Sequence, residues 1–251
     1  MTIKAATRLY VEADLIPGMA LPLDAAKTHF LRNVLRLESG AVIALFNGRD
    51  GEWFGRIAEL GRNKGAVVVE SQSREQGADA DLWLVFAPIK RARVDYMVEK
   101  ATELGVSALY PVLTRRSVVD RVNPERLALI AAEAAEQSER LSVPHIAEPE
   151  KLDHFLSRWD PARRLVLCEE TGLAPPIAET LAGFERGAPA AILTGPEGGF
   201  VETELDALRQ FPFVYRASLG TRVLRADTAA LAALAVFQAL AGDWGERRLR
   251  P

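Results

Sequence analysis

The sequence has little of what disulfide frameworks and metal sites require. Its 251 residues include one cysteine, Cys168, which excludes a disulfide framework and a thiolate zinc cluster. The three histidines, His29, His145 and His154, do not fall at metal-ligand spacing. We therefore expect any cofactor chemistry to be metal-free.

Long apolar runs and an excess of charge are also missing. The longest strongly apolar stretch, residues 229–241, is too short to cross a bilayer. The first 20 residues lack the apolar core of a secretory signal, so we expect a cytoplasmic protein without membrane contact. Lysine and arginine number 31 against 34 acidic residues, which excludes a histone-like binder that relies on bulk positive charge. Local basic patches can still bind nucleic acid without an excess of positive charge.

The first 70 residues show the pattern of a small β-barrel. Short β-branched runs over 41–46, 52–58 and 66–70 predict strands, and Asn-Gly and Asp-Gly pairs in 47–51 supply the positive φ of a turn. Apolar residues at helical spacing predict one helix over 24–35. The polar stretch 71–81 predicts an exposed linker to a second compact unit.

After this linker, strand and helix patterns alternate. Alternation of this kind predicts a largely parallel sheet covered on both faces, and so an α/β fold. The predicted strands are 82–87, 108–113, 165–168, 190–193 and 213–217. The predicted helices are 91–104, 124–140 behind an Asn123 cap, 175–184, 202–210 and 227–241.

Two loops of the second half each follow a strand and precede a helix. They are residues 193–200 and 218–228, and in parallel sheets this position is where ligands bind. The first loop has neither the P-loop nor the dinucleotide pattern, and on these grounds a tight turn alone explains it equally well. The second loop is also explained as a helix start capped by Asp227 or Thr228. That alternative leaves Arg222 and Arg225 without a reason.

Four long segments carry a family resemblance. TGPEGGF (194–200), SLGTRVLRADTA (218–229), KRARVDYMVEKATELGV (90–106) and ERLALIAAEAAEQSERLSVPHI (125–146) closely resemble the bacterial ribosomal RNA small subunit methyltransferase E family of the SPOUT superfamily. The resemblance extends through essentially the whole chain, including HFLRNVLRL at 29–37. It implies methylation of uridine N3 in 16S rRNA within the 30S subunit.

The resemblance also implies an architecture and a cofactor. Residues 1–72 would form a PUA-like RNA-binding β-barrel, and residues 73–251 a SPOUT-type α/β domain that ends in a trefoil knot, binds S-adenosylmethionine and forms a homodimer. Knots are almost absent from proteins, and nothing in the sequence periodicity indicates one. The implied cofactor-binding residues are Leu193, Thr194, Gly195, Pro196, Gly198, Gly199, Ser218, Leu219, Gly220, Val223 and Leu224. One departure is Asp227, where many relatives have glutamate.

Methyl transfer to uridine N3 requires loss of an imide proton and an aligned nitrogen. An arginine can steady charge on the uracil oxygens, and Arg225 is assigned to this role. Glu197 and Asp227 are the available carboxylates for a general base, and a water molecule is the alternative.

Other polar residues have two interpretations each. Arg8, His29, Arg32, Arg36, Lys90 and Arg93 are RNA-binding candidates. Arg8 is equally explained as a structural ion-pair partner. A second set is explained equally well as ordinary surface charge or as a track for RNA phosphates: Lys90, Arg91, Arg93, Lys100, Arg115 and Arg116. Glu133, Glu136, Gln137 and Arg140 form a polar stripe that suits a solvated face, an active site or a dimer interface. Cys168 lies in a predicted strand and is interpreted as inert packing.

Two other functions compete with methylation. One is a non-catalytic RNA-binding protein that has kept the fold, and the other is an α/β enzyme that uses a different nucleotide. The intact glycine loops disfavour the first, whereas the aspartate at position 227 favours it slightly.

Overall fold

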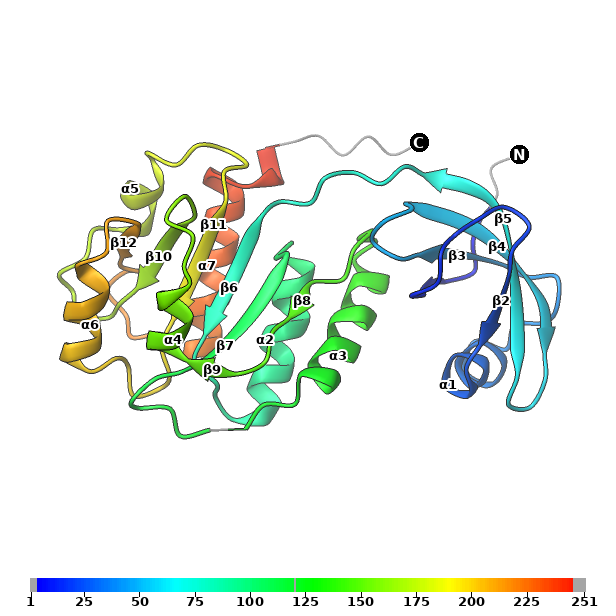
Figure 1. Cartoon of the computed structure of the whole chain (residues 1–251), viewed down its shortest axis with the longest axis horizontal. Helices are drawn as coiled ribbons and strands as arrows, with labels where there is room; N and C mark the ends of the chain where they lie inside the picture. Colours follow the sequence, from blue (N-terminus) through cyan, green and yellow to red (C-terminus); the bar gives the residue numbers. More distant parts are fainter. Residues whose placement is uncertain (1–3, 120, 246–251) are drawn as a thin grey trace. The chain divides into compact units, whose positions relative to one another are not determined.

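The computed structural model describes residues 4–119 and 121–245. The chain divides into two compact units. The first comprises residues 1–78 and 135–143, and the second comprises 79–134 and 144–251. Figure 1 shows both units, with the chain coloured from blue to red.

The first unit is built on a five-stranded sheet with the order β1-β3-β4-β5-β2. Its strands are β1 (Arg8–Tyr10), β2 (Ala20–Leu23), β3 (Val42–Phe46), β4 (Glu52–Leu60) and β5 (Gly65–Arg74). β1 pairs with β3 in parallel, and the remaining pairs are antiparallel. The expected strands over 41–46, 52–58 and 66–70 are present. Their alternate residues, with Leu31, fill one apolar core.

The predicted linker begins later than its composition suggests. β5 continues through Arg74, because Gln72 lies opposite Trp53 and the Ser73 hydroxyl donates to the carbonyl and carboxylate of Glu52. Polar side chains are compatible with a strand in an antiparallel sheet that has one face in water.

The predicted helix over 24–35 is divided in two. The Asp24 carboxylate caps α1 (Ala25–His29) by accepting from the Lys27 N–H, and the chain continues as the π-helical segment η1 (Phe30–Val34). Arg36 follows with φ of 54°, in the left-handed region that ends helices. The segment therefore presents its polar residues over a short, irregular turn.

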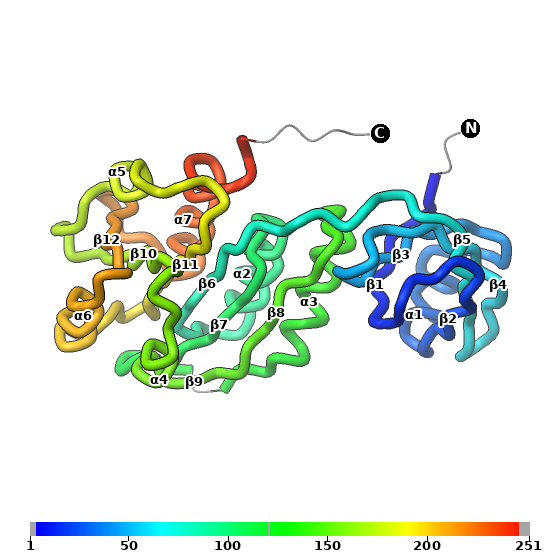
Figure 2. Tube along the Cα trace, turned by 45° about the horizontal axis from the view of Figure 1, so that its top comes forward, coloured from blue at the N-terminus to red at the C-terminus, as the bar shows by residue number. Residues whose placement is uncertain are grey.

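The second unit contains a seven-stranded sheet. Its path is β12-β10-β11-β6-β7-β8, with β9 also paired to β7, and every pairing is parallel. These strands are β6 (Leu82–Phe86), β7 (Ala108–Leu113), β8 (His145–Ile146), β9 (Glu150–Lys151), β10 (Arg164–Cys168), β11 (Ala190–Thr194) and β12 (Val214–Ala217). Figure 2 follows the chain through this layer.

Helices cover both faces of this sheet, as the continuous apolar strands predict. They are α2 (Arg91–Glu103), α3 (Pro124–Gln137), α4 (Leu152–Ser157), α5 (Ile177–Leu181), α6 (Glu202–Arg209) and α7 (Ala226–Leu240), followed by the 3₁₀ turn η2 (Asp243–Gly245). α4 and α6 pack on one face, over Val85, Leu165 and Leu193. α7 lies on the other face against β11 and contacts α2 and α5 (Figure 1).

Candidate functional site

A cavity of about 580 Å³ opens at the carboxyl ends of β10, β11 and β12. These strands are neighbours in the sheet, so the loops that follow them converge at one edge. The end of β10 and the loop after it contribute 168–172, the end of β11 and its loop contribute 194–197, 199 and 200, and the loop after β12 with the start of the next helix contributes 218–226. The two loops singled out in the sequence therefore belong to one site.

Most of the expected cofactor-binding residues line this cavity. They are Thr194, Gly195, Pro196, Gly199, Ser218, Leu219, Gly220, Val223 and Leu224. Leu193 is completely buried in the core beneath α4 and α6 and is not among the lining residues. Gly198 is also not a lining residue, and its carbonyl accepts a hydrogen bond from Arg116.

Backbone conformation requires glycine at three lining positions, Gly172, Gly199 and Gly220, each of which has a positive φ. Gly199 has φ of +66°, and a Cβ built there would lie 2.8 Å from Oε1 of Glu170. Gly220 has φ of +102°, although no atom lies within 4 Å of the position of its Cβ. Residues with a side chain rarely adopt such φ angles, so each of the three loops has a glycine where its backbone requires one.

The loop after β10 is a third wall that the sequence did not predict. It brings Cys168, Glu169, Glu170, Thr171 and Gly172 to the cavity. No glycine-rich pattern marks it. The only usable signal is its place after a strand, and that signal becomes specific once β10 is known to lie between β11 and β12.

Glu169, in the loop after β10, is held in place by two arginines. Its side chain is only 2% exposed and pairs with Arg216 and Arg209, whose Nη2 lies 3.3 Å from the Glu169 Oε2. The Arg216 Nε donates to the other carboxylate oxygen at 2.7 Å. A buried carboxylate requires such partners, since an unpaired one would cost several kcal/mol.

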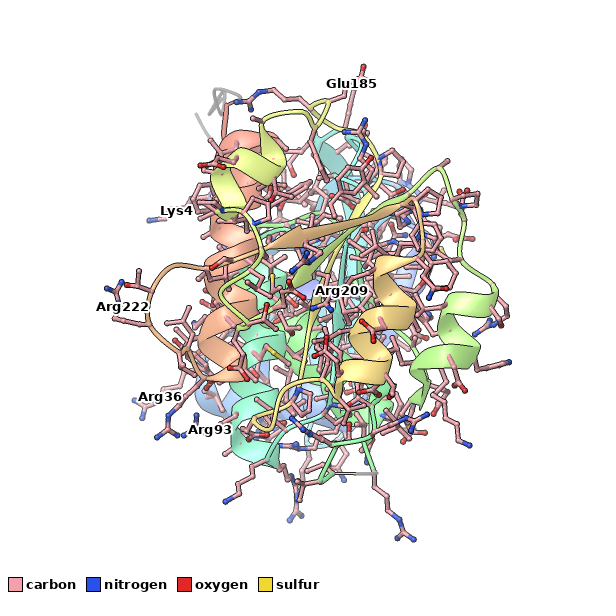
Figure 3. The ribbon with its side chains drawn as sticks, turned by 90° about the vertical axis from the view of Figure 1, so that its left-hand side faces the viewer. Lys4, Arg36, Arg93, Glu185, Arg209 and Arg222 are labelled. Atoms are coloured by element: carbon pink, nitrogen blue, oxygen red, sulfur yellow. The ribbon has the colours of Figure 1, made fainter. Side chains whose placement is uncertain are left out.

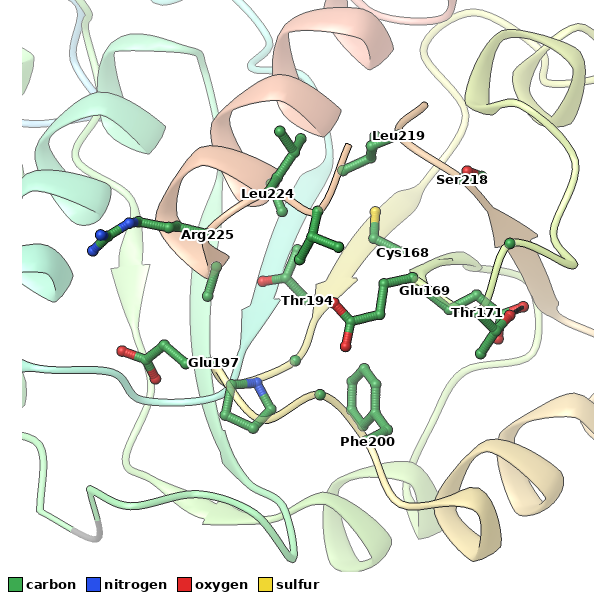
Figure 4. Close-up of a pocket in the computed structure, with 18 of the residues that line it drawn as sticks. Cys168, Glu169, Thr171, Thr194, Glu197, Phe200, Ser218, Leu219, Leu224 and Arg225 are labelled. Carbon is green, nitrogen blue, oxygen red and sulfur yellow. Dashed lines mark hydrogen bonds between the residues drawn. The ribbon is translucent and has the colours of Figure 1, made fainter. Parts of the chain in front are cut away.

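Cys168 ends β10 and reaches the cavity beside this loop (Figure 4). The residue keeps some exposure, yet its surroundings desolvate the thiol and raise its pKa to about 12. The thiol therefore stays protonated and unreactive at neutral pH, in agreement with the interpretation as packing.

The three proposed catalytic residues are not equivalent. Arg225 and Glu197 both line the cavity and are exposed, and Figure 4 shows them at one end of it, with Thr171 and Ser218 at the other. Arg225 is the N-cap residue of α7, but its side chain makes no capping bond. Asp227 is not a lining residue, and its carboxylate pairs with Arg93. Arg222 extends outward from its loop (Figure 3).

The chain matches the models of two known protein families. Residues 76–238 match the model of an RNA methyltransferase domain, which is well over half of the chain. The chain belongs to this RNA methyltransferase family. Residues 23–70 match the model of an RNA methyltransferase PUA domain, so the first unit contains the PUA-like domain that the resemblance implies.

Relatives of this methyltransferase align over nearly its full length. Ribosomal RNA small subunit methyltransferase E of Rickettsia conorii is 31% identical over 93% of this chain and 95% of its own. The Synechocystis protein of the same name is 32% identical over 94% of this chain and 78% of its own. The predicted family is therefore confirmed.

Solved structures agree with the predicted fold class. The Neisseria gonorrhoeae ribosomal RNA small subunit methyltransferase E bound to S-adenosyl methionine superposes with a TM-score of 0.85 at 25% identity, covering 95% of this chain and 99% of that one. A Legionella pneumophila methyltransferase in complex with SAM gives a TM-score of 0.81 at 29% identity, over 96% and 99% of the two chains. The predicted combination of a PUA-like domain and an α/β methyltransferase domain is confirmed.

The RNA-binding candidates of the first unit differ in their surroundings. The Arg8 Nε donates to Glu52 at 2.7 Å, and its two terminal nitrogens donate to the carbonyls of Ala135, Glu136 and Arg140. Its guanidinium also lies 4.4 Å from the ring centroid of Phe46. This geometry supports the structural alternative for Arg8. His29, Arg32 and Arg36 are exposed on or beside η1.

The candidates of the second unit lie at the start of α2. Lys90 is exposed and precedes the helix, whereas Arg93 is partly buried and pairs with Asp227.

The predicted polar stripe does not form one solvated face. α3 ends at Gln137, and the Glu136 carboxylate accepts a hydrogen bond from the Tyr10 N–H at 2.8 Å.

Among residues 4–119 and 121–245, no helix is long and apolar enough to cross a membrane. The same residues contain no cluster of three or more histidine, cysteine or acidic side chains able to hold a metal ion.

Proposed function

We propose that this protein transfers a methyl group from S-adenosylmethionine to N3 of a uridine in 16S rRNA. The observation that carries the proposal is the cavity that three loops form at the strand ends of a domain belonging to the RNA methyltransferase family. It is supported by the high structural similarity to the Neisseria gonorrhoeae enzyme bound to S-adenosyl methionine.

The residues of the cavity fit this cofactor. Its volume of about 580 Å³ lies in the usual range for such ligands. Leu219, Leu224 and Cys168 supply apolar surface for an adenine ring, and the turns at Gly195 and Gly220 expose backbone groups for hydrogen bonding. Glu169, Glu170 and Glu197 place carboxylates around a ligand that carries positive charge. When bound, S-adenosylmethionine supplies an electrophilic methyl group.

The chain's own residues would then orient the uracil and accept its proton. Arg225 projects at the cavity's end, where a guanidinium can hold the uracil oxygens and steady their developing charge. Glu197 lies at the same end and is the carboxylate that we propose, ahead of Asp227, to accept the N3 proton. A water molecule is the alternative acceptor.

The remaining parts of the prediction belong to the same proposal. We propose that residues 1–72 form an RNA-binding domain that uses His29, Arg32 and Arg36, and that residues 73–251 form the catalytic domain with a trefoil knot. We also propose that the enzyme acts in the cytoplasm as a homodimer, and that its substrate is the 30S subunit. Sedimentation of the active protein as a monomer would contradict the dimer, and equal methylation of naked 16S rRNA would contradict the 30S substrate.

Calorimetric titration with S-adenosylmethionine, S-adenosylhomocysteine, ATP and NAD tests the cofactor. We expect binding of the first two alone, and binding of only ATP or NAD would refute the proposal. Mass spectrometry of nucleosides from treated 30S subunits tests the product. A protein that binds both cofactor and RNA but yields no N3-methyluridine would instead be a non-catalytic RNA-binding protein.

A further inference from the structure

The segment after β7 lies against the glycine turn of the cavity, which comprises residues 195–201 after β11. This segment, residues 114–117, holds its own shape. The Thr114 N–H donates to the Ser117 hydroxyl at 2.9 Å, and the Ser117 N–H donates back to the Thr114 carbonyl at 3.1 Å. Such a closed turn gives the two residues between them, Arg115 and Arg116, fixed backbone positions.

Arg116 connects this turn to the loop after β11. Its Nη1 donates to the carbonyl of Gly198 at 2.7 Å, and the Phe200 carbonyl lies 3.5 Å from the same nitrogen. Its aliphatic part runs beside Gly198, where a Cβ built on the glycine would lie 3.5 Å from the Arg116 Cδ. Arg116 also lines the cavity. The side chain thus spans the turn from outside and reaches the site.

Glu204 makes the second connection, from the first turn of α6. Its Oε1 accepts a hydrogen bond from the Arg115 N–H at 2.8 Å, and its Oε2 accepts one from the Val201 N–H at 3.0 Å. One carboxylate therefore binds the segment after β7 and the residue that begins α6. Hydrogen bonds to an ionised group are among the stronger ones in proteins.

The glycine turn has reason to need this support. Gly198 and Gly199 adjoin each other, and Gly199 has φ of +66°. Ordering a backbone residue costs conformational entropy, and this cost is greatest for glycine. Within the loop, the Gly199 N–H donates to the Pro196 carbonyl at 2.9 Å. Side chains outside the loop bind its other polar groups: Arg116 donates to the Gly198 carbonyl, and Glu204 accepts from the Val201 N–H. These hydrogen bonds are present without a ligand.

We propose that Arg116 and Glu204 are positioning residues that keep the 195–201 turn in its binding conformation. The proposal rests on the proposed function for the identity of the ligand, but not for the order of the turn itself. Without these two side chains, a cofactor would have to order the turn on binding. Its affinity would fall by the free energy that this ordering costs.

The experiment compares Arg116→Ala, Arg116→Lys and Glu204→Ala with the parent protein. Arg115→Ala is the matched control, because it removes a neighbouring charge and keeps the N–H that Glu204 accepts. We expect the dissociation constant for S-adenosylmethionine to rise about tenfold or more in Arg116→Ala and Glu204→Ala, and less than about twofold in the control. Arg116→Lys should recover part of the affinity, since an ammonium can donate to the Gly198 carbonyl.

Two further measurements separate positioning from other roles. Methylation by Arg116→Ala should show a raised KM for the cofactor and a parental kcat at saturation, with an unchanged melting temperature. A lower kcat with unchanged cofactor affinity would overturn the proposal, and so would a reduced salt dependence of RNA binding as the main defect.

Amide hydrogen exchange of the free protein tests the turn without any ligand. Exchange in a peptide that covers residues 196–204 should be several-fold faster in Arg116→Ala than in the parent or in Arg115→Ala. Equal exchange in all three proteins would overturn the positioning role. If the parent shows no affinity for S-adenosylmethionine, the proposed function fails, and the exchange result still decides this inference.

Discussion

The guanidinium of Arg93 and the carboxylate of Asp227 lie 3.3 Å apart, between Nη1 and Oδ2. This pair joins the first turn of α2 to the first turn of α7, immediately beyond Arg225. The carboxylate is thus directed to a cation outside the cavity lining, and the guanidinium is already engaged. The shorter side chain at position 227 therefore acts in a contact between helices.

The first prediction compares the two carboxylates. Asp227→Asn should methylate within several-fold of the parental rate, because the carboxylate faces Arg93. Glu197→Gln should lower the rate by about 10²- to 10⁴-fold if Glu197 is the general base. Single-turnover rates at saturating cofactor measure both. A parental rate in Glu197→Gln would leave the proton to water, and a collapse in Asp227→Asn would restore aspartate as the candidate.

The second prediction concerns glycine. Gly195→Val and Gly220→Val should abolish cofactor binding for different reasons. A Cβ at Gly195 would lie 2.9 Å from the Phe200 ring, whereas at Gly220 the space is open and φ of +102° excludes a branched side chain. Gly198→Ala is the control, since its Cβ meets only ordinary contacts at 3.5 Å and beyond. Titration of folded variants with S-adenosylhomocysteine measures the effect, and equal affinity in all of them would remove these turns from the site.

The elements with long periodic patterns were predictable from sequence. Helix α2 and the central strands were expected close to their observed bounds, because alternation and helical spacing are local signals. β1 and β2 were missed because three or four residues carry too short a pattern. The end of β5 was missed because its pairing to β4 is a contact between distant residues.

The site was predictable in part for the same reason. Two of its walls carry glycine patterns and a family resemblance, so they were identified from the chain alone. The third wall, with Glu169, depends on β10 lying between β11 and β12. The order of strands within a sheet does not follow from their order along the chain. The connection of Arg116 to Gly198 likewise joins residues far apart in sequence and has no local signal.

The third prediction uses the raised pKa of Cys168. With a pKa of about 12, only about 10⁻⁴ of the native thiol is ionised at pH 8, so iodoacetamide should modify it very slowly. Unfolding in urea should restore an ordinary pKa and fast labelling. Above roughly pH 9 the unfolded chain loses a proton that the native state retains, so stability should fall as pH rises toward 12. Fast labelling of the native protein would contradict the burial of this thiol.

The last prediction separates the two proposed jobs of arginine. Arg225 lines the cavity, so Arg225→Ala should lower the methylation rate and leave cofactor affinity nearly intact, because only interactions made in the transition state raise turnover. Arg32 and Arg36 are exposed on or beside η1, so their alanine variants should instead weaken RNA binding and reduce its salt dependence. Turnover at saturating RNA should be unchanged in those two variants. Single-turnover rates and salt-titrated binding to 30S subunits distinguish the outcomes. If Arg225→Ala methylates at the parental rate, the loop after β12 contributes cofactor binding alone.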